Sequence, residues 1–144
     1  MEPRELTERE RNRIKRVYGY TDEDIASFSP KQRRLHGFEL TRMDHRMIAE
    51  VVEVENCAAQ HKVGDKYVYG DGGALLPEES TVKWFCCWAI APIMPFFYMF
   101  YDRMSMGLNP ADMAFEYFHC TDTGLKCGGW GKCMFEVHWE KVSK

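Results

Sequence analysis

An uncharged run of 18 residues most constrains how this chain folds: residues 84–101 read WFCCWAIAPIMPFFYMFY. A run of this length just reaches the lower range for a bilayer-spanning helix. Pro92 and Pro95 oppose a straight span, because each removes a backbone N–H donor and clashes with the preceding helical turn. Lys83 directly precedes the run and Asp102 directly follows it, so the uncharged stretch extends no further in either direction. We therefore expect a buried core helix that is kinked at the prolines, and we do not expect a membrane span.

The clearest strand pattern lies near the end of the chain, in the segment KCMFEVHWEK at 132–141. Cys133, Phe135, Val137 and Trp139 alternate there with polar or charged residues. Such alternation predicts a strand that buries one face and exposes the other. Cys133 lies on the buried face, so we interpret it as a core residue.

Three further segments are expected to form strands, because β-branched and aromatic residues are concentrated between turn signals. They lie within residues 47–55, 66–73 and 113–120, and a glycine-rich turn ends the second one. Ser80 or Thr81 is expected to cap the apolar helix, which ends by Gly107. The predicted fold class is α+β, with about four mostly antiparallel strands packed on one long apolar, proline-kinked helix.

Residues 1–46 differ from the rest in charge: they carry a net charge of +2, against −5 for the remainder. Thr7 with Glu10, and Thr21 with Asp24, have the spacing of helix-capping boxes, and Ser29 precedes a proline as a helix cap does. We predict a charged helical extension over 1–46 and a compact domain over 47–144. Short helices of this kind need a surface to dock on. That surface is either the body of the protein itself or a partner, for which the candidates are a larger metabolic enzyme and, in a homo-oligomer, another copy of the chain.

Composition narrows the partners and the compartment. The formal net charge of −3 disfavours nucleic acid as a partner, because phosphate binding needs a clustered basic face. The first 16 residues contain no apolar core of a signal peptide, so a cytoplasmic location is expected. Disulfides seldom persist there. The six cysteines are therefore interpreted as buried thiols, metal ligands or redox groups.

Several motifs resemble an uncharacterised family of small prokaryotic proteins that is defined by a numbered sequence profile rather than by an activity. They are a cysteine loop followed by Gly64–Asp65, the sequence Cys86-x-x-Ala89 before a proline, and the late pair Cys120 and Asp122. The resemblance covers about residues 47–142. It implies a compact domain of the kind met mainly in anaerobes, often beside larger metabolic enzymes. It implies no reaction, and Cys133 is an addition to the family pattern.

The cysteines at the ends of predicted elements are candidate metal ligands. Thiolates that converge from such positions can hold Zn²⁺ or an iron–sulfur cluster, and a histidine can replace one thiolate. The spacing of the late cysteines is not that of a zinc knuckle, and buried thiols remain the alternative. The candidate metal ligands are Cys57, His61, Cys86, Cys120 and Cys127.

The glycine-rich stretch GGWG supplies candidate ligand-binding residues: Gly128, Gly129 and Trp130. Glycines let the backbone adopt positive φ and approach a ligand closely. The same residues suit an irregular hairpin loop, which is the alternative reading.

Three functions follow from these residues. The first is a small accessory or ligand-binding protein with a cysteine-lined site. The second is a thiol-dependent isomerase or lyase of anaerobic metabolism, with Cys57, Cys120 and Asp122 as candidate catalytic residues. The third is a structural, oligomerising domain. Within the first two, Cys133→Ala is predicted to lower stability by about 1 kcal/mol or more and to spare any ligand, whereas Cys120→Ala or Cys127→Ala should abolish the ligand or the activity.

Overall fold

The structure, a computed structural model, describes residues 4–38 and 43–142. Its body is one antiparallel sheet of four strands in the order β2-β1-β4-β3. The strands are β1 (His45–Glu55), β2 (Lys66–Tyr69), β3 (Tyr117–His119) and β4 (Lys132–Lys141). The α+β architecture predicted from the sequence is confirmed. The predicted bounds of β4 are correct, β2 ends at the glycine-rich turn as expected, and β3 is shorter than the predicted strand.

The central pair, β1 and β4, forms the longest ladder of the sheet. Phe135 and Val137 of β4 are almost fully buried and lie opposite Val51 and Ala49 of β1. A β-bulge interrupts the ladder at Val52, where the register shifts between Val51 and Glu53. This extra residue keeps Glu53 on the outer face and turns Val54 inward, opposite Cys133.

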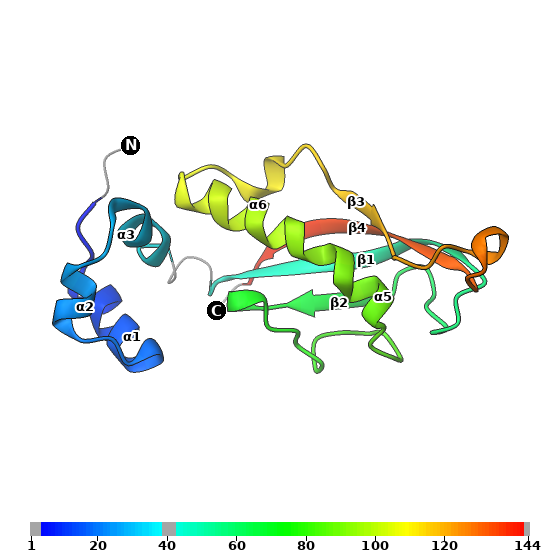
Figure 1. The fold of residues 1–144 in the computed structure, drawn as a ribbon, viewed down its shortest axis with the longest axis horizontal. Coiled ribbons are helices and arrows are strands. Elements are labelled where there is room, and N and C mark those ends of the chain that lie inside the picture. The colour runs from blue at the N-terminus through cyan, green and yellow to red at the C-terminus, as the bar shows by residue number, and fades with distance from the viewer. Residues whose placement is uncertain (1–3, 39–42, 143–144) are drawn as a thin grey trace.

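The apolar run forms two helices and a turn that cross the inner face of the sheet (Figure 1). They are α5 (Cys87–Ile90), the 3₁₀ turn η2 (Ala91–Ile93) and α6 (Met94–Ser105). Pro92 and Pro95 each lie in the first turn of their segment, where a missing N–H does not break an intrahelical bond. Phe96, Phe97 and Phe100 are buried against the sheet. The predicted proline-kinked core helix is confirmed. Among the described residues, no helix has the length and apolar content to cross a bilayer.

The predicted helix cap at Ser80 or Thr81 is wrong, because α5 begins only after Cys86. Both hydroxyls instead accept hydrogen bonds from backbone N–H groups on the outer edge of β2. Ser80 Oγ accepts the Val68 N–H at 3.0 Å, and Thr81 Oγ1 accepts the Lys66 N–H at 2.8 Å. A strand edge presents unpaired backbone groups that need partners, and this loop supplies them.

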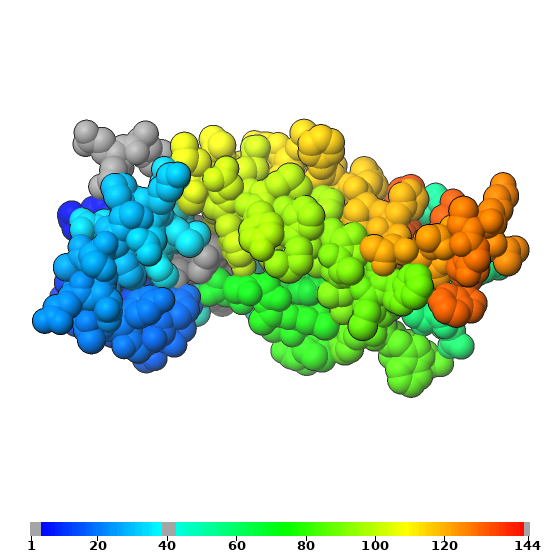
Figure 2. Space-filling view, in the orientation of Figure 1, coloured from blue at the N-terminus to red at the C-terminus, as the bar shows by residue number. Residues whose placement is uncertain are grey.

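The N-terminal segment forms three short helices at the opposite end of the molecule from the loop that joins β3 and β4 (Figures 1 and 2). They are α1 (Glu8–Tyr18), α2 (Asp22–Ala26) and α3 (Pro30–His36), and each begins with a capping box. The helices enclose a separate small core of Leu6, Ile14, Ile25 and Phe28. An ion pair of 3.0 Å joins Arg13 of α1 to Asp71 of the body. That these helices bind a larger enzyme or a second copy of the chain stays a prediction.

Candidate functional site

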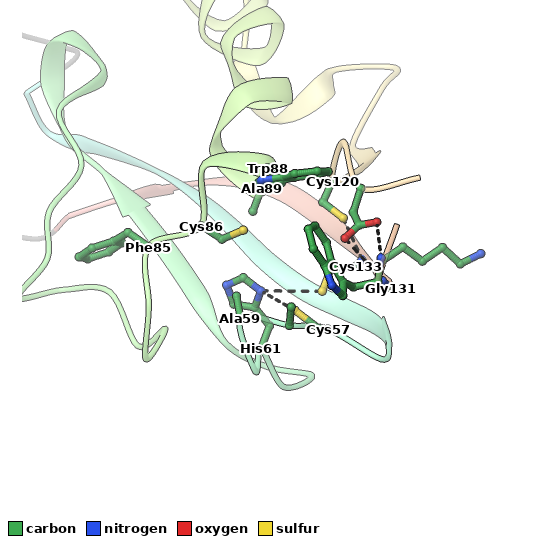
Figure 3. Close-up of a pocket in the computed structure, with 14 residues that line it drawn as sticks. Cys57, Ala59, His61, Phe85, Cys86, Trp88, Ala89, Cys120, Gly131 and Cys133 are labelled. Carbon is green, nitrogen blue, oxygen red and sulfur yellow. Dashed lines mark hydrogen bonds between the residues drawn. The ribbon is translucent and has the colours of Figure 1, made fainter. Parts of the chain in front are cut away.

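The loops at the end of the sheet farthest from α1–α3 (Figure 1) enclose a cavity of about 330 Å³, whose lining residues are drawn in Figure 3. Three segments that are distant in sequence meet there: the loop after β1, the start of α5, and the loop that leads from β3 into β4. Four of the six cysteines line it, together with a histidine, an aspartate and three large aromatic side chains. The lining residues are Cys57, Ala58, Ala59, His61, Phe85, Cys86, Trp88, Ala89, Cys120, Asp122, Trp130, Gly131, Lys132 and Cys133.

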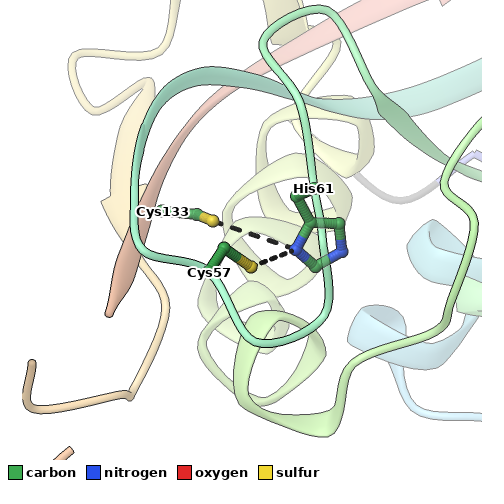
Figure 4. Close-up of side chains that lie close together, drawn as sticks. All are labelled: Cys57, His61 and Cys133. Carbon is green, nitrogen blue, oxygen red and sulfur yellow. Dashed lines mark hydrogen bonds between the residues drawn. The ribbon is translucent and has the colours of Figure 1, made fainter. Parts of the chain in front are cut away.

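Three of these side chains, Cys57, His61 and Cys133, point toward one another (Figure 4). His61 Nδ1 lies 3.2 Å from Cys57 Sγ and 3.8 Å from Cys133 Sγ, and the three atoms are all within 4.8 Å of one another. Cys57 and His61 share the β1–β2 loop, where a backbone hydrogen bond from Gln60 N–H to the Cys57 carbonyl forms a turn. Gln60 adopts positive φ in this turn, which brings the two side chains together.

The buried hydroxyl of Tyr67 fixes the orientation of the His61 ring. It lies 2.7 Å from His61 Nε2, accepts the Cys86 N–H at 3.0 Å and donates to the Trp84 carbonyl at 3.3 Å. With the Tyr67 hydroxyl donating to Trp84, the consistent tautomer carries the imidazole proton on Nε2 and donates it to Tyr67. The Nδ1 lone pair then faces the two sulfur atoms. A histidine that binds a metal has this arrangement, with its second nitrogen donating to a fixed acceptor.

Burial also sets the protonation of the cluster. It lowers the pKa of the His61 imidazole, although the Asp65 carboxylate opposes the shift, so the ring is neutral near pH 7. Burial, followed by contact with Cys57, raises the pKa of the Cys133 thiol. In the absence of a cation, Cys133 is therefore a protonated thiol rather than a free thiolate.

Cys133 is buried, as the strand alternation predicts, but packing is not its only role in the structure. Its Sγ faces both His61 and the cavity. The strand pattern places Cys133 in the core and not in the site, because alternation shows only which face of a strand is inward. The pattern does not show that the inward face at the start of β4 borders a cavity.

The other predicted metal ligands separate into two groups. Cys86 and Cys120 line the cavity but are not members of the three-residue cluster. The Cys120 sulfur accepts the backbone N–H of Cys133 at 3.2 Å. Cys127 is exposed in a 3₁₀ turn and does not line the cavity, so the structure does not bring it to the other ligands.

Asp122, a predicted catalytic residue, organises the loop before β4. Its Oδ1 accepts the backbone N–H groups of Gly124 at 2.9 Å and Trp130 at 3.1 Å. A Cβ atom at Gly129 would lie 2.1 Å from the same oxygen, so only glycine fits there. Gly128 adopts positive φ at the end of the 3₁₀ turn. Neither Gly128 nor Gly129 lines the cavity, and both shape the loop before β4.

Trp130, by contrast, lines the cavity, and it meets Trp88 at the mouth. The two indole rings are 5.7 Å apart at an interplanar angle of 75°. Trp130 is 62% exposed and Trp88 is 44% exposed. Trp88 could not be identified from the sequence, because it lies inside the apolar run, where no pattern distinguishes an exposed aromatic residue from a buried one.

Geometrically, the site offers two sulfur donors and one imidazole nitrogen at the base of an apolar cavity with an aromatic mouth. Such a donor set suits a soft or borderline metal ion, and the Cys57–His61 pair alone also suits thiol chemistry. Comparisons of the chain with protein-family models, with curated proteins and with solved structures return no match. The function of the chain is therefore inferred from the geometry of these side chains.

Proposed function

We propose that this chain is a small cytoplasmic metal- and ligand-binding protein that holds Zn²⁺ through Cys57, His61 and Cys133. The observation that carries the proposal is the convergence of two Sγ atoms on the Nδ1 atom of a neutral, buried histidine. Two thiolates and one imidazole are a known ligand set for zinc sites that keep an open position.

The distances support a tetrahedral ion. With Zn–S near 2.3 Å and Zn–N near 2.0 Å, tetrahedral geometry separates a sulfur from a nitrogen ligand by about 3.5 Å. The two sulfur–nitrogen distances in the cluster, 3.2 and 3.8 Å, lie on either side of that value. Small side-chain rotations therefore suffice to bind the ion, with no rearrangement of the strands.

Charge and ligand number favour zinc over an iron–sulfur cluster. Two thiolates neutralise the charge of one Zn²⁺ ion, and the neutral imidazole adds none. An iron–sulfur cluster is usually held by four cysteine thiolates; four cysteines line the cavity, but only two of them belong to the close cluster with His61. The surroundings of the cluster also support a metal site, because the Tyr67 hydroxyl is hydrogen-bonded to His61 Nε2, the ring nitrogen that faces away from the two sulfur atoms.

A thiol-dependent enzyme is the second candidate, because Cys57 Sγ is within hydrogen-bond reach of a histidine that borders a cavity. Activation of the thiol would transfer its proton to His61. The lowered pKa of the buried imidazole opposes that transfer. We therefore rank metal binding above thiol catalysis.

The test is metal analysis of the full chain, purified under reducing, oxygen-free conditions and reconstituted with zinc. We expect about one equivalent of bound zinc. Cys57→Ser, His61→Ala and Cys133→Ser should each bind less than about a tenth of an equivalent. The matched controls are Cys87→Ser and Cys127→Ser, which alter exposed thiols outside the cavity and should keep the metal.

Alkylation separates the two candidates. In the metal-free protein, thiol catalysis predicts that iodoacetamide modifies Cys57 much faster than the other cysteines. Metal binding predicts slow modification of both Cys57 and Cys133 once zinc is added. Failure of the reconstituted chain to retain zinc, together with a fast-reacting Cys57, would replace the metal proposal with the enzymatic one.

A further inference from the structure

We infer that the cavity above this site binds a small organic thiol with an aromatic or apolar body. Its sulfur would take the coordination position that the chain leaves open, and its body would lie between Trp88 and Trp130. The inference rests on the proposed function and adds the chemical class of the ligand.

The open position follows from the number of donors. Three side chains form the cluster, whereas zinc takes four ligands. The neighbouring Cys120 sulfur is already held by the Cys133 N–H, and Cys86 is not in the cluster either. The cavity borders the cluster, so a molecule inside it can reach the ion. A thiol suits this position, because sulfur is among the donors that zinc binds well.

The walls of the cavity select the rest of the molecule. Phe85, Trp88 and Trp130 supply aromatic surface, and three alanines supply small apolar surface. The volume of about 330 Å³ is at the small end of the range for ligand sites, which begins at about 300 Å³. The three aromatic side chains are 44–62% exposed, so a bound apolar ligand would remove a large hydrophobic area from water.

The charged residues of the lining disfavour a hard anion such as phosphate. Lys132 Nζ lies 3.6 Å from Glu55 Oε2, so the charge of the ammonium group is already partly neutralised. The Asp122 carboxylate would repel an anion, and its Oδ1 is occupied by backbone N–H groups. An anion that lies in the cavity without coordinating the metal would lack an adequate counter-charge. A neutral body with one thiol fits the site better, because the thiol proton passes to solvent and the resulting thiolate charge lies directly on the metal ion.

The aromatic mouth is held in place before any ligand arrives. The backbone N–H of Thr121 donates to the Trp88 carbonyl at 2.8 Å, which ties the loop before β4 to α5. Asp122 holds the Trp130 N–H from the same loop. Because both tryptophans are fixed through their backbones, little loop ordering is needed on binding, and preorganisation of this kind favours affinity.

The experiment is calorimetric titration of the zinc-loaded full chain with three probes. Phenylmethanethiol has both the aromatic body and the thiol, phenylmethanol lacks the thiol, and 2-mercaptoethanol lacks the aromatic body. We expect phenylmethanethiol to bind at least about ten-fold more tightly than either of the other two. With cobalt in place of zinc, it should also increase the sulfur-to-metal charge-transfer absorption. Equal affinities for the three probes would overturn the inference.

Tryptophan variants test where the body binds. Trp88→Ala and Trp130→Ala should each weaken phenylmethanethiol binding by roughly ten-fold and retain the metal. Trp84→Ala is the matched control, since Trp84 is 58% exposed but does not line the cavity. An equal effect of all three variants would refute the assigned location.

Metal content, measured on the same samples, separates this inference from the proposed function. A zinc-loaded chain that binds no phenylmethanethiol, with cobalt absorption typical of three thiolate ligands, would show that Cys86 or Cys120 closes the site, and only the thiol inference would fall. A chain that retains no zinc refutes the metal proposal itself. Binding of phenylmethanethiol to that metal-free chain would show that the cavity takes the ligand without metal coordination, which also overturns the inference as stated.

Discussion

Two tyrosines on β2, Tyr67 and Tyr69, provide a sharp test of the hydrogen-bond network beneath the site. Both side chains are buried, and burial raises the pKa of both hydroxyls, so both stay protonated at neutral pH. Tyr67 contacts three polar partners, as described above. The Tyr69 hydroxyl has no hydrogen-bond partner among the described residues. The change of tyrosine to phenylalanine removes the same atom from two different environments.

We expect opposite effects on stability. Tyr67→Phe leaves the buried His61 Nε2–H and Cys86 N–H without acceptors, and should lower the free energy of unfolding by about 2–3 kcal/mol. Tyr69→Phe removes a buried hydroxyl that makes no bond, and should leave the stability unchanged or raise it by up to about 1 kcal/mol. The assay is urea unfolding of the metal-free chain with a chelator present, which removes any contribution from bound zinc.

The same pair should separate in zinc affinity. Loss of the Tyr67 hydroxyl frees His61 to rotate or to move its proton to Nδ1, and changes of this kind typically weaken metal binding by about 10- to 100-fold. Tyr69→Phe should bind zinc like the unmodified chain. Equal stability losses in the two variants, or an unchanged zinc affinity for Tyr67→Phe, would refute the assigned role of the Tyr67 hydroxyl.

Three further predictions concern protonation, ligands and loop packing. Burial lowers the folded-state pKa of His61, so the neutral ring contributes to the stability of the metal-free chain above about pH 6.5. This contribution is lost as the pH falls through the lower folded-state pKa. Urea unfolding from pH 5 to 8 should show the loss of stability, and His61→Gln should reduce that loss. Cys133→Ala should lower stability by about 1 kcal/mol and also abolish zinc binding, while Cys127→Ala does neither, as elemental analysis and thermal unfolding would show. Gly129→Ala should destabilise the chain by about 1–3 kcal/mol, since its Cβ would collide with Asp122, and an unchanged melting temperature would contradict the loop packing.

Much of the fold could be predicted because its signals are local. The alternation in β4, the capping box at Thr7 and Glu10, and the prolines of the apolar run each describe the backbone within a few residues. The helix cap assigned to Ser80 or Thr81 failed for the same reason. A hydroxyl before an apolar run favours a helix cap, but the exposed edge of β2 competed for it, and that edge exists only after the sheet has formed.

The site could be predicted only in part, because it depends on contacts between distant segments. The four-residue separation of Cys57 and His61 within one loop indicated a possible pair, and the structure brings them together. Cys133 is 72 residues from His61, and only the pairing of β1 with β4 places it there. Cys127 was a reasonable candidate by residue type, but a short turn directs it to solvent.

The bulge at Val52 has a consequence for how this chain tolerates insertions and deletions. If Val52 paired in the ladder instead of bulging, continuous pairing from Val51 would place Glu53 opposite Cys133 and turn Val54 outward. A carboxylate would then enter the core beside the cluster, and the β1–β2 loop that carries Cys57 would begin one position earlier along β4. Deletion of Val52 makes the ladder regular and keeps Val54 opposite Cys133, so zinc binding should survive it, whereas deletion of Val54 brings a glutamate opposite Cys133 and should eliminate zinc binding even if the sheet still forms. Removal of one residue from the exposed segment 77–79, beyond β2, also leaves the alignment of β1 with β4 intact. Zinc retention across a series of single-residue deletions would thus report, position by position, where the alignment of the two central strands is fixed.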